Sequence, residues 1–203
     1  MTKIKLCGLT REQDILSVNV LKPDYIGFVF AGKSRRQVSR EKALQLKSLL
    51  DPSIQAVGVF VDEEPQLIAE YLRSGIIDVA QLHGREDEDY LLRLRRLIDR
   101  PLFKAFRVQS AGDAALAIKS SADMILLDSG AGTGEVFDWD LLHAIERPFF
   151  LAGGLDPRNV SGAIKELQPW GVDVSSGIET DGFKDENKMA AFTAAVRKGQ
   201  EAL

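Results

Sequence analysis

The chain has little of what several common protein classes need. Its 203 residues include one cysteine and two histidines, which excludes an internal disulfide and offers no recognisable spacing of zinc ligands. No run approaches the ~20 consecutive apolar residues of a membrane-spanning helix. Positive charge is in deficit, with 26 Lys and Arg against 30 Asp and Glu and a net charge of −4. Because nucleic-acid-binding proteins carry basic faces, we expect no nucleic-acid partner.

The composition is that of an ordinary globular chain. Hydrophobic residues make up 45% and charged residues 28%, which gives no reason to expect disorder. The length suits one buried core, so we expect a single domain over residues 1–203. The first residues lack the basic-then-apolar pattern of a secretory segment, and a lone cysteine agrees with a reducing compartment. We therefore expect a cytoplasmic protein with no membrane partner.

Eight short apolar runs recur along the chain at intervals of roughly 20–30 residues, about the length of one strand, one helix and two loops. Each is followed by a segment with helical spacing of apolar residues, such as Leu67, Ile68, Tyr71 and Leu72. Nearly continuous apolar runs are typical of parallel strands buried on both faces. The predicted strands are 4–7, 25–30, 56–61, 77–82, 102–106, 124–127, 149–152 and 172–174.

Eight such units predict an α/β fold, a closed (β/α)₈ or TIM barrel. An open doubly wound sheet is the rival architecture, but it usually has fewer strands and a glycine-rich first turn, which Gly8-Leu9-Thr10 is not. The active site of a (β/α)₈ barrel lies at the C-terminal ends of its strands. Polar residues at those ends are therefore candidate site residues.

Cys7 and Asp128 end the first and sixth predicted strands. An unpaired cysteine is more often a buried packing residue, so the strand end is what makes Cys7 a candidate. Asp128 lies between an apolar run and a glycine-rich loop at 129–134. A carboxylate buried there is costly unless it is paired or used, and ordering of the loop is the structural alternative.

Other strand ends carry possible ligand-binding residues. Arg36 follows the second strand and can form a forked ion pair with a ligand carboxylate. His83 follows the fourth strand, where it shapes the pocket, moves a proton or serves as a structural donor. Small residues after the seventh and eighth strands lie where such barrels bind phosphate through backbone N–H groups, although plain loop chemistry also explains them. These small residues are Gly153, Gly154, Ser175, Ser176 and Gly177.

Two further expectations concern charged groups. No metal site is expected, because the histidines and the cysteine lie in separate units, and the acidic run 86–89 is typical of the first turn of a helix. Lys5 has the same strand parity as Cys7 and should point into the barrel, where a charge needs a partner. Asp173 is the predicted partner.

Taken together in this order, nine motifs resemble the phosphoribosylanthranilate isomerase family nearly from end to end. They are KLCGLT at 5–10, DYIGFVF at 24–30, SRR at 34–36, VGVF at 57–60, QLHG at 81–84, LDS at 127–129, GTG at 132–134, LAGGL at 151–155 and DVSSGIE at 173–179. The resemblance implies a TIM barrel that rearranges N-(5-phosphoribosyl)anthranilate in tryptophan biosynthesis. It implies no cofactor, and a small phosphosugar-anthranilate molecule as the substrate.

The resemblance also implies roles. Cys7 matches the general base, Asp128 the general acid, and Arg36 the residue that contacts the anthranilate carboxylate, while the loops around Gly154 and Ser176 match the phosphate site. Two departures are minor: Leu6 stands where isoleucine or valine is common, and Glu135 where lysine is. An Amadori rearrangement needs a proton donor and a proton acceptor, so the site must hold a neutral carboxyl and a thiolate.

Three alternatives stay open at this point. An indole-glycerol-phosphate synthase on the same barrel would need positioned lysines, and a histidine-pathway isomerase would have aspartate where Cys7 stands. A non-catalytic sensor of phosphate ligands would keep only the phosphate loops and has no reason to retain both Cys7 and Asp128. The sequence fits a monomer and a homodimer equally.

Overall fold

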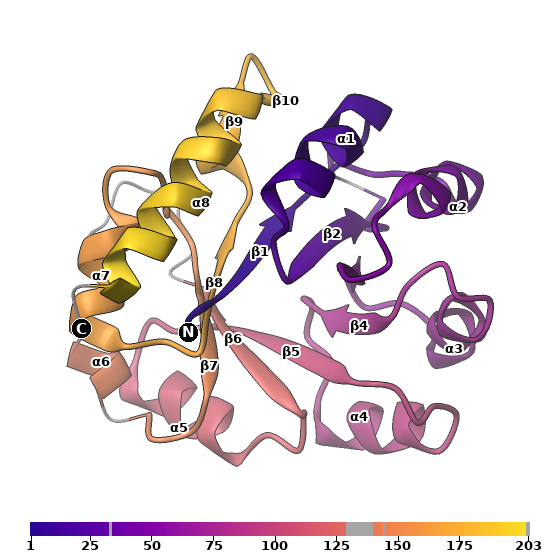
Figure 1. Cartoon of the computed structure of the whole chain (residues 1–203). Coiled ribbons are helices and arrows are strands. Elements are labelled where there is room, and N and C mark those ends of the chain that lie inside the picture. Colours follow the sequence, from indigo (N-terminus) through magenta and orange to yellow (C-terminus); the bar gives the residue numbers. More distant parts are fainter. Residues whose placement is uncertain (33, 129–139, 144, 202–203) are drawn as a thin grey trace.

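The computed structural model describes residues 1–32, 34–128, 140–143 and 145–201. Eight parallel strands pair in sequence order, and the last pairs with the first, which closes the sheet into a barrel. Figure 1 shows them gathered at the centre of the molecule. The strands are β1 (Lys3–Cys7), β2 (Tyr25–Val29), β3 (Gln55–Phe60), β4 (Val79–Leu82), β5 (Leu102–Arg107), β6 (Met124–Asp128), β7 (Phe149–Ala152) and β8 (Gly171–Val174).

A helix follows each barrel strand, and the helices form a ring outside the barrel (Figure 1). They are α1 (Glu12–Leu21), α2 (Arg40–Leu49), α3 (Pro65–Arg73), α4 (Glu88–Arg95), α5 (Ala111–Lys119), α6 (Asp140–His143), α7 (Val160–Leu167) and α8 (Glu186–Glu201). Sequence signals fix their ends: α3 has a proline at its start, and the Asp87 side chain caps α4 by accepting a hydrogen bond from the Tyr90 N–H. Within the described residues, no helix is both long and apolar enough to cross a bilayer.

The predicted (β/α)₈ barrel is confirmed, and the strand ends differ from expectation by at most two residues. The largest difference is at β4, which begins at Val79 although the apolar run begins at Ile77. Ile77 is buried against Gly58 without joining the sheet, and the Asp78 carboxylate accepts a hydrogen bond from the Ala56 N–H. An apolar pattern indicates which residues are buried, and here the buried segment begins at Ile77, before the strand pairing begins at Val79.

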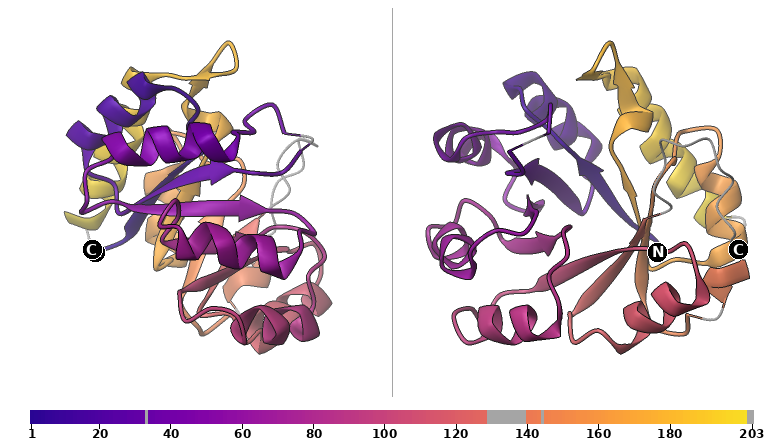
Figure 2. Two further views of the ribbon diagram at one scale, coloured as in Figure 1. Left: turned by 90° about the vertical axis from the view of Figure 1, so that its right-hand side faces the viewer. Right: turned by 180° about the vertical axis from the view of Figure 1, so that it is seen from behind.

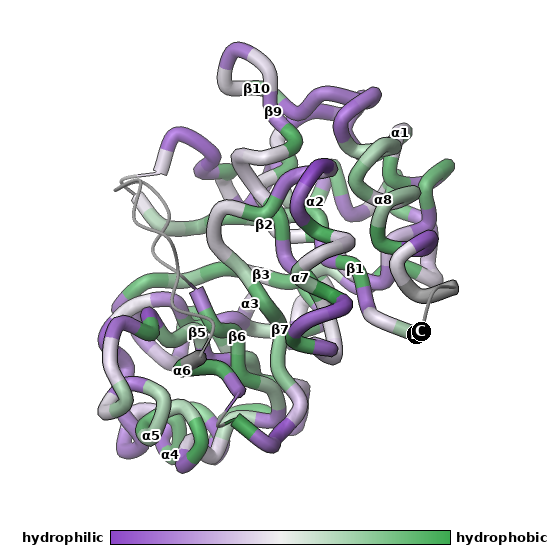
Figure 3. Tube along the Cα trace, turned by 90° about the vertical axis from the view of Figure 1, so that its left-hand side faces the viewer, coloured by the Kyte–Doolittle hydropathy of each residue, from purple (hydrophilic) through white to green (hydrophobic). Residues whose placement is uncertain are grey.

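Alternation along the strands divides the core into two layers. One layer lies between strands and helices and includes Phe28, Leu46 and Phe192. The other fills the barrel near the N-terminal ends of the strands, where the rings of Tyr25 and Phe103 meet edge to face at 5.7 Å. Figure 3 shows the barrel strands as largely hydrophobic. Because the bulky rings fill only that end, the opposite end is left for a cavity.

The chain departs from the simple repeat after β8. A 3₁₀ turn (η1, Ser176–Ile178) and a short antiparallel hairpin, β9 (Glu179–Thr180) and β10 (Phe183–Lys184), precede α8. Figures 1 and 2 show this hairpin projecting beyond the ring of helices, next to α1 and α8. It is anchored to the loop after β1, since the Arg11 guanidinium stacks over the Phe183 ring with 5.0 Å to the ring centroid.

Candidate active site

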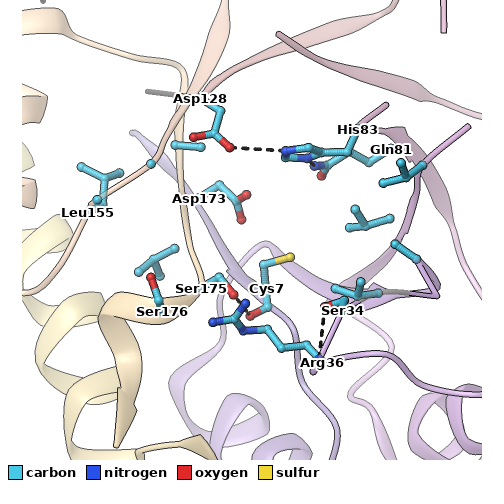
Figure 4. A pocket seen from close by; sticks show the side chains of 18 residues that line it. Cys7, Ser34, Arg36, Gln81, His83, Asp128, Leu155, Asp173, Ser175 and Ser176 are labelled. Carbon is cyan, nitrogen blue, oxygen red and sulfur yellow. Dashed lines mark hydrogen bonds and ion pairs between the residues drawn. The ribbon is translucent and has the colours of Figure 1, made fainter. Parts of the chain in front are cut away.

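A cavity of about 340 Å³ opens at the C-terminal ends of the barrel strands, a volume in the range of small-molecule sites. Figure 4 shows Asp128 on one side, Cys7 on the other and Asp173 between them. Of the predicted site residues, all except Gly177 line this cavity. The lining residues are Cys7, Val29, Ala31, Ser34, Arg36, Val59, Val61, Gln81, His83, Asp128, Ala152, Gly153, Gly154, Leu155, Asp173, Val174, Ser175 and Ser176.

Cys7 is the last residue of β1 and lies opposite Gly27 of β2. A Cβ atom added to Gly27 would lie 2.5 Å from the Cys7 sulfur, so the glycine provides the space that the thiol occupies. Lys5, two residues earlier on the same face of β1, is fully buried. Its Nζ donates to Asp173 Oδ1 at 2.9 Å, which confirms the predicted pairing.

Charged neighbours act on the Cys7 thiol in opposite directions. Burial raises its pKa above the ordinary value, and the Asp173 carboxylate raises it further, while the ammonium groups of Lys5 and Lys184 lower it. The pKa of Lys5 is itself raised: burial disfavours its charged form, but Asp173 and Cys7 outweigh the burial. Lys5 therefore stays cationic beside the thiol.

Asp128 is the last residue of β6 and faces a histidine across the barrel mouth. Its Oδ2 lies 3.3 Å from His83 Nε2, and Gln81 Nε2 lies 3.0 Å from His83 Nδ1, within hydrogen-bond distance. His83 thus joins Gln81 on one side of its ring to Asp128 on the other. Gln81 belongs to the motif at 81–84, but the sequence predicted no role for it. It is buried, and its Oε1 has no hydrogen-bond partner among the described residues.

Glu86 holds the loop that carries His83. The acidic run 86–89 was expected to form the first turn of a helix, but α4 begins at Glu88, and this interpretation is wrong for Glu86. Its carboxylate pairs with Lys104 Nζ at 2.8 Å and accepts hydrogen bonds from the Asp62 and Gly84 N–H groups. A buried carboxylate needs such partners, and here they fix the turn after β4.

Arg36 makes the forked geometry expected of it, with a partner from the protein itself. Its Nε and Nη2 donate to the two carboxylate oxygens of Glu179 in β9 at 2.6 and 2.8 Å. Lys184 of β10 donates to Glu179 Oε1 at 2.6 Å. Burial would raise the pKa of Glu179, but the bonds from Arg36 and Lys184 outweigh it and hold the pKa below its usual value. Sequence reasoning missed Glu179 as a site residue and Lys184 altogether.

The loops after β7 and β8 meet beside these side chains. Gly153 and Gly154 have φ angles of 85° and 64°, in the left-handed region where other residues are strained. Gly177 lies behind the cavity, where an added Cβ would be 2.0 Å from the Leu155 carbonyl oxygen, so the two loops pack in direct contact. The Ser175 hydroxyl donates to the Cys7 carbonyl at 3.2 Å, which ties the loop after β8 to the thiol-bearing strand.

No cluster of three or more His, Cys, Asp or Glu side chains in the described ranges is placed to hold a metal ion. The loop at 129–134 and Glu135 lie outside the described residues. What the cavity offers is a thiol and a carboxyl facing one space, a guanidinium at its wall and glycine-rich loops at its edge. Fold and site thus define a (β/α)₈-barrel enzyme equipped for acid–base chemistry on a small anionic molecule.

Comparison with known proteins identifies the family. The family model described as N-(5'phosphoribosyl)anthranilate (PRA) isomerase matches residues 4–195. N-(5'-phosphoribosyl)anthranilate isomerase of Endomicrobium trichonymphae is 47% identical over 202 residues, covering 97% of this chain and 99% of the relative. The chain belongs to the N-(5'-phosphoribosyl)anthranilate isomerase family.

Solved structures agree with this assignment. A phosphoribosyl anthranilate isomerase in complex with reduced 1-(o-carboxyphenylamino)-1-deoxyribulose 5-phosphate superposes with a TM-score of 0.86 at 34% identity, covering 98% of this chain and 100% of the other. Monomers generated from the dimeric phosphoribosylanthranilate isomerase of Thermotoga maritima give a TM-score of 0.86 at 35% identity, with the same coverage.

Proposed function

We propose that this chain catalyses the Amadori rearrangement of N-(5-phosphoribosyl)anthranilate to 1-(2-carboxyphenylamino)-1-deoxyribulose 5-phosphate in tryptophan biosynthesis. The observation that carries the proposal is that Cys7 and Asp128, 121 positions apart by subtraction of their numbers, line the same cavity. A sister enzyme with aspartate in place of Cys7, or a phosphate sensor without an acid and a base, would not need this pair.

The proposed reaction uses the two groups in turn. The neutral Asp128 carboxyl gives its proton to the ribose ring oxygen as the bond from C1′ to that oxygen breaks, and the anthranilate nitrogen lone pair forms the iminium. The Cys7 thiolate then removes the proton from C2′, which the iminium has made acidic, and the electron pair left behind moves to form an enolamine. Tautomerisation of the enolamine gives the ketone. The iminium serves as the electron sink, so the reaction requires no cofactor.

Neighbouring groups stabilise the ionised form of each catalytic side chain. The ammonium groups of Lys5 and Lys184 favour the thiolate of Cys7 against the cost of its burial. After Asp128 has given up its proton, its carboxylate lies 3.3 Å from His83 Nε2, which can donate a hydrogen bond to it. A charge-assisted hydrogen bond of this kind stabilises the carboxylate that forms in the step.

We assign the binding roles by the chemistry of the cavity wall. Arg36 contacts the anthranilate carboxylate, and the loop residues Gly153, Gly154, Ser175 and Ser176 receive the phosphate through backbone N–H groups. Gly177 supports that loop from behind by its contact with Leu155. His83 faces the sugar next to Asp128.

We further propose that residues 1–203 act as one domain in the cytoplasm. A thiolate base requires a compartment that keeps Cys7 reduced, which supports that location. The protein is expected as a monomer or a homodimer, and light scattering distinguishes the 22.4 kDa chain from a pair of chains.

The test is a direct assay. Purified protein is mixed with enzymatically generated phosphoribosylanthranilate, and the loss of anthranilate fluorescence is followed. Cys7→Ala and Asp128→Ala should each lower kcat by about 10²-fold or more. Both variants should still bind reduced 1-(o-carboxyphenylamino)-1-deoxyribulose 5-phosphate, the reduced product analogue. Asp89→Ala, at an exposed position in the first turn of α4, is the matched control and should leave kcat unchanged.

The outcomes separate the alternatives. Near-normal turnover in the Cys7 or the Asp128 variant removes that residue from the mechanism. A folded wild-type protein that binds the phosphorylated analogue without turning over the substrate would be the sensor or a sister enzyme. Arg36→Met should mainly raise KM, because a charge-assisted pair with the substrate is lost, and an unchanged KM would take the carboxylate role away from Arg36.

A further inference from the structure

The hairpin after β8 places two buried charged residues behind Arg36. The Glu179 side chain is 9% exposed and that of Lys184 is 2% exposed, although Lys is rarely buried without a reason. Lys184 Nζ also donates to the Ser175 carbonyl at 2.9 Å and lies 3.3 Å from the Ser175 hydroxyl. The proposed reaction gives Glu179 no role, and it gives Lys184 only an effect on the pKa of the Cys7 thiol.

Glu179 occupies only one edge of the Arg36 guanidinium. A guanidinium carries five N–H groups in one plane, and Glu179 uses the Nε and Nη2 donors. The edge between Nη1 and Nη2 keeps its N–H groups in the same plane, and that edge can form a second forked pair with another carboxylate. Since Arg36 lines the cavity, a substrate carboxylate has a prepared donor edge.

The path of the Arg36 side chain is fixed at both ends. A Cβ atom on Gly8 would lie 2.6 Å from Arg36 Cδ and 3.2 Å from the Ser175 hydroxyl oxygen, so the stem passes directly over the turn that follows Cys7. Glu179 holds the far end. An arginine held in one conformation before the ligand arrives loses less side-chain entropy on binding.

The charges of the cluster also suit an anion. Arg36 and Lys184 together with Glu179 sum to one positive charge. Burial lowers the pKa of Lys184 most, Glu179 raises it, and Arg36 lowers it by a smaller amount. Without the Glu179 carboxylate, the two cations would face each other. The carboxylate lets both cations stand beside the cavity and leaves a net positive charge for the substrate carboxylate.

We propose that Glu179 is the positioning residue for recognition of the substrate carboxylate: it fixes the plane of the Arg36 guanidinium, and Lys184 links it to Ser175 of the phosphate loop. The inference rests on the proposed role of Arg36. Its consequence is that the two ends of the substrate are held in one frame, the carboxylate by the Glu179–Arg36 pair and the phosphate by the loop to which the hairpin is joined.

The experiment compares two probes that differ only in the carboxylate. One is the reduced product analogue, and the other is its counterpart with a phenyl ring in place of the carboxyphenyl ring; their Kd values are measured by calorimetry. Glu179→Gln should weaken the carboxylate probe by about 10-fold or more and change the second probe by less than about 2-fold, as expected for a charge-assisted pair. KM for the substrate should rise while kcat changes little. Glu70→Gln, exposed on α3, is the matched control.

Three comparisons decide the result. Arg36→Met sets the reference for loss of carboxylate preference, and Arg36→Met/Glu179→Gln should lose no more than Arg36→Met alone, because the two residues act as a unit. Glu179→Asp keeps the charge beside Lys184, but its shorter side chain reaches the Arg36 guanidinium less well. It should therefore give an intermediate loss of carboxylate preference. This variant decides the question if Glu179→Gln does not fold.

The contrary outcomes are distinct. Equal weakening of both probes by Glu179→Gln or Glu179→Asp would make the residue merely structural and overturn the proposal. Retained carboxylate preference in the Glu179 variants, with its loss in Arg36→Met, would overturn the proposal and leave the role of Arg36 intact. Retained preference in Arg36→Met would refute the role of Arg36 and this proposal with it.

Discussion

Among substitutions that keep the volume of the side chain, replacement of Lys5 by methionine should be one of the most destabilising in this barrel. Lys5→Met retains the stem, while Asp173, with a side chain only 10% exposed, loses its ion-pair partner. Breaking a buried pair by removing one partner costs about 3–5 kcal/mol. With an unfolding entropy of about 2.1 cal/mol/K per residue over 203 residues, that cost corresponds to a Tm lower by roughly 7–12 °C.

The sign of the pH dependence follows from the pKa of Lys5. That pKa is raised in the folded protein, so the ion pair contributes its full stability below the pKa of an unfolded lysine and loses it as pH rises past the folded value. The full Tm difference should therefore be present at neutral pH. In the same variant the pKa of Cys7 should rise further, because a cation beside the thiol is gone. The part of the rate profile that rises as Cys7 loses its proton should therefore move to higher pH.

The assay is thermal unfolding by circular dichroism at neutral pH together with a pH–rate profile. Lys3→Met is the matched control, since Lys3 pairs with Asp24 at 2.7 Å with side chains 41% and 33% exposed, and exposed pairs contribute about 0–1 kcal/mol. Lys5→Met/Asp173→Asn should recover part of the loss because no charge is left unpaired. A Tm for Lys5→Met no lower than that of Lys3→Met, or an unmoved rate profile, would refute the reasoning.

Two further predictions concern the thiol and the phosphate loop. Since burial raises the pKa of Cys7 and the thiolate is the proposed base, kcat/KM should increase with pH above neutrality; a profile that is flat or falls there speaks against Cys7 as the base. Gly177→Ala puts a Cβ 2.0 Å from the Leu155 carbonyl oxygen and should weaken competitive inhibition by inorganic phosphate by about 10-fold. Gly162→Ala, in α7 with nothing within 4 Å of the added Cβ, should leave Ki unchanged, and equal Ki values for the two variants would contradict the assigned place of the phosphate.

Much of the architecture was predictable because its signals are local and repeated. Each apolar run marks a buried strand, and eight repeats leave little choice but a closed barrel. Strand parity predicted that Lys5 points into the barrel and needs a partner, and the register of β1 and β8 places the expected partner, Asp173, opposite it. The strand ends at Cys7 and Asp128 followed from the same pattern, so their shared place at one mouth required only the barrel.

Contacts made outside the repeat were not predictable. Arg36 and Glu179 are 143 positions apart, and Glu179 belongs to a hairpin inserted between β8 and α8, so no periodic signal links the two. Glu86 looks like any acid at a helix start, and only the packing of Lys104 beneath the turn reveals it as a buried partner. The hydrogen bond between Gln81 and His83 likewise depends on side-chain rotation, which residue spacing does not encode.

The most direct test of the central claim is a crystal structure of this protein with the reduced product analogue bound. The account predicts the Cys7 sulfur within about 3.5 Å of C2′, and an Asp128 carboxylate oxygen within about 3.2 Å of the oxygen that belonged to the ribose ring. It also predicts the carboxylate of the analogue on Arg36. An analogue bound with C2′ turned away from Cys7, or with its former ring oxygen beyond the reach of Asp128 even through one water, would contradict the account.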